Sequence, residues 1–222
     1  MSEPEDALQP AAARDLYALC ARLFASEVDA SLYQSLAQGP LLSLMGLEPG
    51  ALGEEDSPAK ALDALAVEYC RLFIGPQPMC PPFASACRGE ALLGGRARTR
   101  LEEFLVRNDL VLTEELMRIA SPDHVAVELA ILAMLHDRAS AAEESSEAMA
   151  QASRALAEFL GGHVLPWVPD WLQGVEEHAA HPLYRGAAQL GLALLDEERR
   201  RGEDASAAGC VCARRERGVR TE

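Results

Sequence analysis

The sequence is poor in aromatic residues, in β-branched residues and in long hydrophobic runs, and each shortage excludes a class of protein. Aromatic residues make up only 5% of the chain, whereas Ala and Leu are abundant. Because Ala and Leu favour helices and β-branched and aromatic residues favour strands, the composition predicts an all-α fold. No apolar run approaches the ~20 residues of a membrane-spanning helix. The acidic start MSEPEDALQP also lacks the features of a signal peptide. We therefore expect a cytoplasmic protein without membrane insertion.

Basic residues are outnumbered, 20 to 35, by acidic residues, which gives a net charge of −15. Binding to nucleic acid depends on basic contacts to phosphate, so this balance argues against a nucleic-acid partner. A field of one sign can speed the encounter with a cationic partner, but it also simply keeps a protein in solution. The charge leaves both interpretations open.

The six cysteines do not form a metal-binding pattern. Cys80 and Cys87 are seven residues apart, and the sequence contains no CxxC pair. Cys210 and Cys212 supply only two ligands, fewer than a structural zinc site needs. In a reducing compartment a disulfide framework is also not expected. We expect no metal.

The length of 222 residues suits a single domain. We expect a flexible N-terminus (1–10), an all-helical domain (11–201) of roughly eight to twelve helices, and a disordered tail (202–222). Apolar spacing together with start and stop signals predicts the following helices: 11–25, a short one from Asp29 to about Gly39, 58–73, 89–108, 122–139, 144–160, 169–179 and 182–200.

The segment Ile74–Glu90 is rich in proline and cannot form a regular helix over most of its length. Loops this long inside a compact domain are usually functional or disordered, and its apolar residues Met79 and Phe83 favour an ordered one. The sequence Ser121-Pro122 after it has the character of a helix start, with Asp123 in the first turn.

The helix that follows is apolar from Val125 to Leu135 except for Glu128, and Asp123 and His124 stand at its entrance. One interpretation is a small metal-binding protein or an enzyme, because His124 and Glu128 share a helix face at the i, i+4 spacing. These are too few ligands for a metal centre, and no nucleophile elbow, P-loop or dinucleotide motif is present. The alternative is that Glu128 is structural and accepts hydrogen bonds from a loop, from an arginine such as Arg71 or Arg88, or from a tyrosine.

Two aromatic pairs also repeat at the i, i+4 spacing: Tyr69 with Phe73, and Trp167 with Trp171. At this spacing two side chains meet on one helix face, and a stacked core pair is commoner than a ligand platform. We expect both pairs to lie in the core.

Four motifs in order identify a family resemblance. They are EYCRLFIGP (68–76), PPFAS (81–85), SPDHVAVEL (121–129) and FLGGHVLPWVPDW (159–171). The chain resembles the TorD/DmsD/NarJ group of cytoplasmic redox-enzyme maturation chaperones, over roughly residues 11–198.

The resemblance implies an all-helical chaperone rather than an enzyme. Such proteins bind an apo-oxidoreductase catalytic subunit, usually molybdopterin-dependent and often through its twin-arginine signal peptide, and hold it back until its cofactor is inserted. The resemblance implies no tightly bound cofactor, only an indirect role with the molybdopterin cofactor of the client. The protein is expected to be a monomer or a homodimer, including a domain-swapped one. A helical adaptor with unrelated partners remains an alternative.

The family motifs match particular residues of this sequence. The Tyr-x-x-Leu-Phe motif matches Tyr69, Leu72 and Phe73, and the Pro-Asp-His motif matches Pro122, Asp123 and His124, with Glu128 as the acid one turn later. Three positions depart from the family pattern: Ser121 replaces a Glu, and Phe83 and Ala84 replace the Tyr and Glu of Pro-Pro-Tyr-Glu-Ser.

These residues lead to a hypothesis for the binding site. A receptor for a twin-arginine peptide needs a carboxylate for the guanidiniums beside an apolar groove. We expect Asp123 and His124 to face such a groove, so that Asp123→Ala weakens peptide binding by a few kcal/mol and His124 makes binding sensitive to pH. The expected client-binding residues are Asp123, His124, Tyr69, Phe73, Pro82, Phe83 and Ser85, with Met79 adding apolar surface; the expected supporting residues are Pro122, Glu128 and Leu72.

Overall fold

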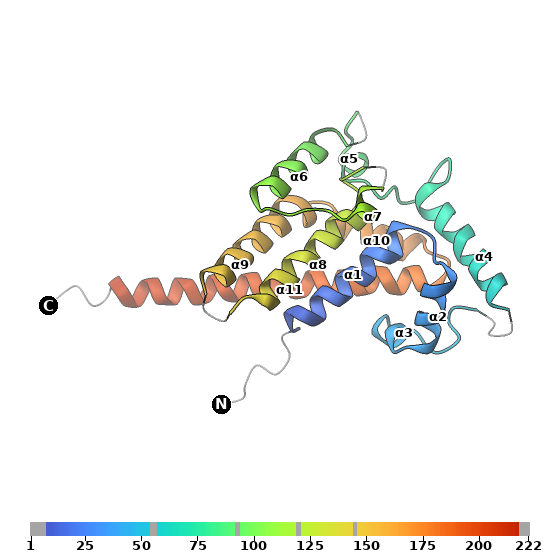
Figure 1. The fold of residues 1–222 in the computed structure, drawn as a ribbon, viewed down its shortest axis with the longest axis horizontal. Helices are drawn as coiled ribbons and strands as arrows, with labels where there is room; N and C mark the ends of the chain where they lie inside the picture. The colour runs from blue at the N-terminus through green and yellow to red at the C-terminus, as the bar shows by residue number, and fades with distance from the viewer. Residues whose placement is uncertain (1–7, 54–56, 92–93, 119–120, 144–145, 218–222) are drawn as a thin grey trace.

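A computed structural model describes residues 8–53, 57–91, 94–118, 121–143 and 146–217 of the protein. Side chains are described for these residues except Glu115, Met117 and 204–217. Within the described part the fold is all-α, as predicted: helices α1 to α11, two π-helical turns and one isolated β-bridge (Figure 1). No described helix has the length and apolar character needed to cross a membrane.

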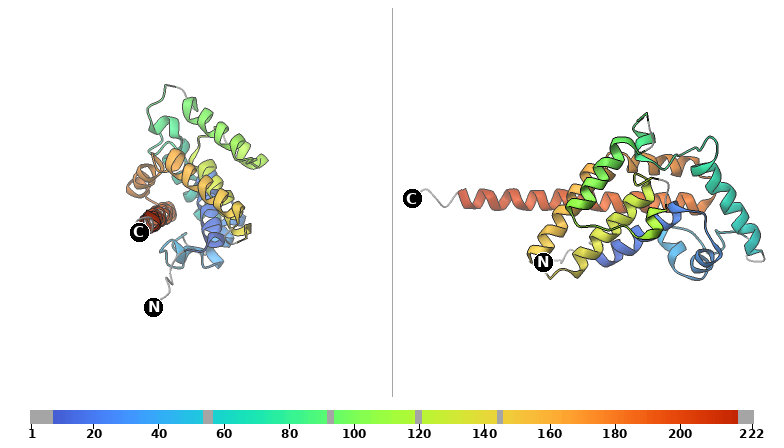
Figure 2. Two further views of the ribbon diagram at one scale, coloured as in Figure 1. Left: turned by 90° about the vertical axis from the view of Figure 1, so that its left-hand side faces the viewer. Right: turned by 45° about the horizontal axis from the view of Figure 1, so that its top comes forward.

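Two central helices organise the bundle. α1 (Pro10–Ala25) packs along α8 (Val125–Ala141), and α9 (Glu147–Phe159) packs against α8 as well. α11 (Pro182–Arg217) packs against α10 (Val168–His178) and α1. Figure 2 views α11 along its axis and shows the other helices gathered to one side of it. α8 is buried along most of its length, which explains why its sequence is apolar nearly all round.

Shorter elements surround this centre and carry the motif loops. They are α2 (Ala30–Gln38), α3 (Leu41–Leu44), α4 (Pro58–Tyr69), α5 (Ala84–Cys87), α6 (Gly95–Arg107) and α7 (Glu114–Met117). The π-helical turn η1 (Cys70–Ile74) follows α4, and the second such turn, η2 (Leu160–Val164), follows α9. Both turns lie inside family motifs, and π-turns are frequent near functional sites.

Most helix starts agree with the sequence-based prediction, and Asp29 caps α2 by accepting a hydrogen bond from the N–H of Leu32. Three starts are wrong. α9 begins at Glu147 rather than at residue 144, with Ser146 as its N-cap. α6 begins at Gly95 rather than near Gly89. α8 begins at Val125 rather than at Pro122, because His124 acts as the N-cap and the residues before it form a turn.

The tail also differs from the expectation. α11 remains helical to Arg217, past Gly202, where the sequence predicts that order ends. Its last part projects from the body as a single helix (Figure 1). The segment is rich in Ala, Glu and Arg, which have high helix propensity, so local preference outweighs the polar, low-complexity character on which the prediction depended. Residues 218–222 and 1–7 lie outside the described part.

The core contains both predicted aromatic pairs. Tyr69 and Phe73 lie 5.1 Å apart between ring centroids, and Trp167 and Trp171 lie 6.4 Å apart. All four are buried. Phe24 of α1 packs edge-on against Trp171 at 5.0 Å, so the first helix contacts the last of the four motifs (159–171).

Close packing of α11 against the α3 region makes a testable prediction. A Cβ added at Gly186 would lie 2.9 Å from the carbonyl oxygen of Met45, whereas one at Gly202 meets nothing within 4 Å. We expect Gly186→Ala to lower the free energy of unfolding by about 1–2 kcal/mol, because overpacking outweighs the helix-propensity gain. Gly202→Ala in the same helix should raise it by up to about 1 kcal/mol. Urea denaturation measures both, and equal stability of the two variants would contradict the close contact.

Candidate functional site

Two motif segments far apart in the sequence are paired by their backbones. Phe83 and His124 form an isolated antiparallel bridge. The N–H of Ala84 donates to the carbonyl of Asp123 at 2.9 Å, and the N–H of Val125 donates to the carbonyl of Pro82 at 2.9 Å. The bridge places the proline-rich loop beside the first turn of α8.

The buried carboxylate of Asp123 adds a side-chain hydrogen bond between the same two segments. Its side chain is fully buried, and its Oδ2 accepts a hydrogen bond from the N–H of Ser85 at 3.0 Å. Its Oδ1 accepts a second one from the hydroxyl of Ser121. Burial acts to raise the pKa of Asp123, but the hydrogen bonds from Ser121 and Ser85 outweigh burial and hold the pKa below its ordinary value. The expectation that Asp123 faces a groove is therefore wrong, because both of its oxygens are already bonded inside the protein.

Ser85, expected to contact the client, is part of the same internal network. It is fully buried, and its hydroxyl accepts a hydrogen bond from the N–H of Gly94 at 3.0 Å. Ser85 thus connects the proline-rich loop to the start of α6.

His124 does face a cavity. Its Nδ1 accepts a hydrogen bond from the N–H of Ala126 at 3.1 Å, and its ring packs edge-on against Phe83 at 5.0 Å. Burial lowers the pKa of His124 to about 4, so the ring is neutral at physiological pH. Because Nδ1 is an acceptor, the proton of the neutral ring lies on Nε2. That N–H has no hydrogen-bond partner among the described residues.

Glu128 forms a buried hydrogen bond behind the site, and its partner is a tryptophan rather than one of the arginines considered from the sequence. Its carboxyl is buried and accepts a hydrogen bond from the indole N–H of Trp167 at 2.9 Å. Arg71, considered as a partner, is instead paired with Glu68 at 2.8 Å. Burial raises the pKa of Glu128 to about 8, so this side chain is largely protonated at neutral pH.

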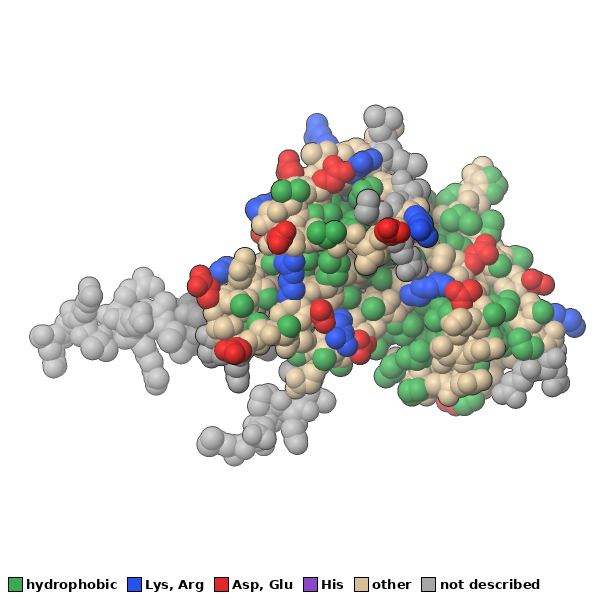
Figure 3. Space-filling model, in the orientation of Figure 1, with side chains coloured by type: hydrophobic (Ala, Val, Ile, Leu, Met, Phe, Trp, Pro, Cys, Tyr) green, Lys and Arg blue, Asp and Glu red, His purple; other side chains and the backbone are tan. Residues whose placement is uncertain are grey.

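The cavity has a volume of about 590 Å³ and lies between α1, α8, the proline-rich loop and the α7 segment. We call it the groove. Its floor consists of methyl groups from two facing helices: Ala18, Ala21 and Ala25 of α1 with Ala130 and Ala133 of α8. The remaining apolar lining comes from Ile74, Leu116, Met134, Pro82 and Phe83. In the space-filling view, hydrophobic side chains with a few charged ones among them cover the middle of the molecule (Figure 3).

The groove brings together part of the expected site. Tyr69, Pro82, Phe83 and His124 line it. The hydroxyl of Tyr69 is not available to a ligand, because it donates to the carbonyl of Phe24 at 3.1 Å; burial raises its pKa to about 12.

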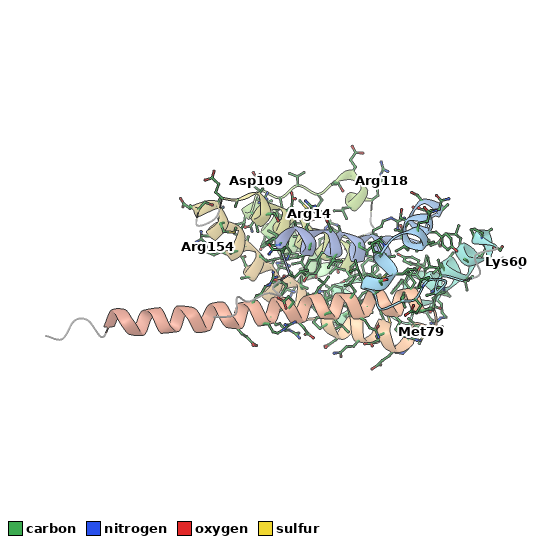
Figure 4. The ribbon with its side chains drawn as sticks, turned by 90° about the horizontal axis from the view of Figure 1, so that it is seen from below. Arg14, Lys60, Met79, Asp109, Arg118 and Arg154 are labelled. Atoms are coloured by element: carbon green, nitrogen blue, oxygen red, sulfur yellow. The ribbon has the colours of Figure 1, made fainter. Side chains whose placement is uncertain are left out.

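The other expected residues do not line the groove. Phe73 and Leu72 are buried in the core, and Pro122 lies in the turn before α8. Met79 is 47% exposed but lies on the side of α11, away from Arg118 of the groove (Figure 4).

The alanine floor and the α7 residues were missed from the sequence. One signal for them is present: alanines recur at helical spacing (18, 21, 25) on α1, which also carries large buried residues such as Tyr17, Leu23 and Phe24. Nothing in the sequence indicates that this stripe faces a second one on α8.

The arrangement does not assemble a metal site. Asp123, His124 and Glu128 each make a separate contact, and nowhere in the described residues do three or more His, Cys, Asp or Glu side chains converge as metal ligands. Its chemistry is that of an apolar groove with a few hydrogen-bond donors.

Comparison with known families agrees with the motifs. The family model described as the nitrate reductase delta subunit matches residues 29–173, which include all four motifs. The chain belongs to this family, the TorD/DmsD/NarJ family.

Individual relatives are chaperones by name. The chain is 27% identical to the chaperone protein TorD of Vibrio cholerae serotype O1, over 78% of this chain and 83% of that protein. It is 30% identical to the chaperone protein TorD of Shewanella pealeana, over 79% and 82%. It is 27% identical to the Tat proofreading chaperone DmsD of Salmonella typhi, over 58% and 57%.

The buried bonds of Asp123 predict a folding defect rather than a loss of a client contact. Asp123→Ala leaves the N–H of Ser85 and the hydroxyl of Ser121 without an acceptor, and should lower the free energy of unfolding by about 2–4 kcal/mol. Asp123→Asn keeps one side-chain oxygen and should cost less. Urea denaturation at pH 7 measures both. If the Asp123→Ala variant has native stability but binds the client more weakly, Asp123 contacts the client and its role is not structural.

The raised pKa of Glu128 predicts a distinct pH dependence. Below the unfolded pKa of about 4.5 the side chain is protonated in both states. From there to about pH 8 only the folded protein keeps the proton, so stability falls as pH rises, by at most about 1.4 kcal/mol per pH unit. Glu128→Gln preserves an acceptor for Trp167 and lacks this loss.

We therefore expect the stability advantage of Glu128→Gln over the native protein to be small at pH 5 and to grow toward pH 8. The exposed Glu103→Gln is the matched control and should show no such growth. Denaturation at several pH values tests this, and parallel profiles for the native protein and Glu128→Gln would show that Glu128 is not buried as described.

Proposed function

We propose that this protein is a redox-enzyme maturation chaperone that holds the precursor of an oxidoreductase through an apolar segment bound in the groove. The observation that carries the proposal is the groove itself, an apolar concavity of about 590 Å³ at the junction of two family motifs. Monomeric proteins rarely leave such a concavity unused, and helical grooves of this kind receive apolar peptide segments.

The occupant that fits best is the apolar stretch of a twin-arginine signal peptide. The relative from Salmonella typhi is named a Tat proofreading chaperone, which supports this occupant. The client is then a molybdopterin-dependent catalytic subunit, bound in the cytoplasm before export. The chaperone acts by binding and not as an enzyme, and it has only an indirect role with the cofactor of the client. Its state as a monomer or a domain-swapped homodimer stays a prediction.

The neutral state of His124 changes one expectation from the sequence. With a pKa of about 4, His124 does not titrate between pH 5.5 and 8. Binding should therefore not depend on this residue's charge in that range, in contrast to the pH sensitivity that the sequence predicts.

A groove-filling substitution tests the proposal. Ala130 lines the groove, so Ala130→Phe should occupy part of it and weaken peptide binding at least about tenfold, the effect of losing roughly 1.4 kcal/mol of contacts. Ala148→Phe, at an exposed alanine of α9 outside the groove, is the control and should bind as the native protein does. Calorimetric titration with a twin-arginine signal peptide of an oxidoreductase measures both.

Two results would count against the proposal. Equal binding by Ala130→Phe and the native protein would place the peptide elsewhere. No binding of either the signal peptide or the full-length precursor to the native protein would reject the chaperone role for that client.

A further inference from the structure

The charged groups on the described lining of the groove have one sign. They belong to two arginines, Arg22 and Arg118, and no carboxylate is present in that described set. His124, a residue only 4% exposed, adds its Nε2–H, which has no hydrogen-bond partner among the described residues. A ligand that meets this surface encounters hydrogen-bond donors and positive charge, together with methyl groups.

The two arginines differ in their availability. The guanidinium of Arg22 already has partners within the protein: it contacts the carboxylate of Asp29 at 2.5 Å and the hydroxyl of Ser26 at 2.9 Å. Among the described side chains, Arg118 forms one ion pair, with Glu114 at 3.5 Å. The side chains of that pair are 79% and 91% exposed, so water screens the pair strongly. The exposed guanidinium of Arg118, labelled in Figure 4, can therefore contact a ligand at the α7 side of the groove.

We propose that the groove prefers peptides in which an acidic residue flanks the apolar stretch, and that Arg118 forms an ion pair with this acidic residue. The proposal rests on the proposed function, since it assumes that an apolar segment binds in the groove. It also separates the charge preference of the groove from that of the whole molecule. The net charge of −15 attracts cations from a distance, whereas the charged side chains on the described lining of the groove are both arginines.

The consequence for a twin-arginine peptide is that its two arginines lie outside the groove. Arg22 is already neutralised by Asp29, so the like charge that a guanidinium would meet is that of Arg118. Among the described side chains, that charge is offset by the exposed carboxylate of Glu114 at 3.5 Å. The internal position of Asp123 removes the acid that the sequence indicates for this purpose. An acceptor, by contrast, can bind both the guanidinium of Arg118 and the N–H of His124.

Three peptides with one apolar core test the proposal. They differ only in the residues that flank the core, which are Glu, Gln or Lys. Calorimetric titration at low ionic strength should give the tightest binding for the Glu peptide and the weakest for the Lys peptide. Each step should be about two- to fivefold, the size expected for an exposed charge pair. The difference should shrink in high salt because exposed charges are screened.

Charge reversal at Arg118 provides the matched test in the protein. Arg118→Glu should invert the order of the three peptides. Arg154→Glu changes the net charge by the same amount at an exposed site on α9 (Figure 4) and should leave the order unchanged. Circular dichroism verifies that both variants are folded, and Arg118→Gln, which should abolish the order, replaces Arg118→Glu if the latter is not.

The outcomes separate the two proposals. If the Gln peptide binds but all three peptides have equal affinity, or the Lys peptide binds most tightly, the charge preference is wrong and the groove remains a peptide site. An order that Arg154→Glu inverts as strongly as Arg118→Glu also overturns the role of Arg118. If none of the three peptides binds to the native protein, the charge preference is overturned, and the proposed function fails as well when neither the signal peptide nor the full-length precursor binds.

Discussion

The backbone pairing of the proline-rich loop with the entrance of α8 is the constraint on which the groove depends. Two hydrogen bonds across the Phe83–His124 bridge join segments about forty residues apart, and Asp123 adds a third bond, to the N–H of Ser85, across 38 residues of sequence. The paired segments supply one wall of the groove, while rigid helices supply its floor. Without this pairing, the proline-rich loop would lose the contacts that hold Pro82 and Phe83 in position.

Two buried carboxyls support the wall and floor in opposite protonation states. Asp123 remains ionised because it accepts hydrogen bonds from Ser121 and Ser85, whereas burial keeps the carboxyl of Glu128 largely neutral beside the indole of Trp167. The contrast follows from the number of donors each carboxyl meets. It explains how Asp123, just before α8, and Glu128, in the first turn of α8, can both lie close to the core without two buried negative charges repelling each other.

The sequence predicts the helices better than it predicts the site. Apolar periodicity and the Asp29 cap locate α1 and α2, and motif order identifies the family, because these signals are local. The direction of Asp123 was not predictable, since Ser121-Pro122 has the character of a helix start while tertiary bonds convert it into a turn. The partner of Glu128 lies 39 residues away on another element. The groove needs α1 and α8 to bring their alanines face to face, which no local pattern encodes.

The alanine floor also affects how the peptide preference of such a receptor can change during evolution. Its shape is set by methyl groups on two helices whose opposite sides form the core, so the backbone separation of α1 and α8 fixes the greatest depth available. A single exchange of one of the less buried alanines, Ala18 or Ala130, for a larger residue would make the groove shallower without altering the buried faces of either helix. Duplicated copies of such a gene could therefore acquire different peptide preferences by one-step changes while retaining the same stability and fold.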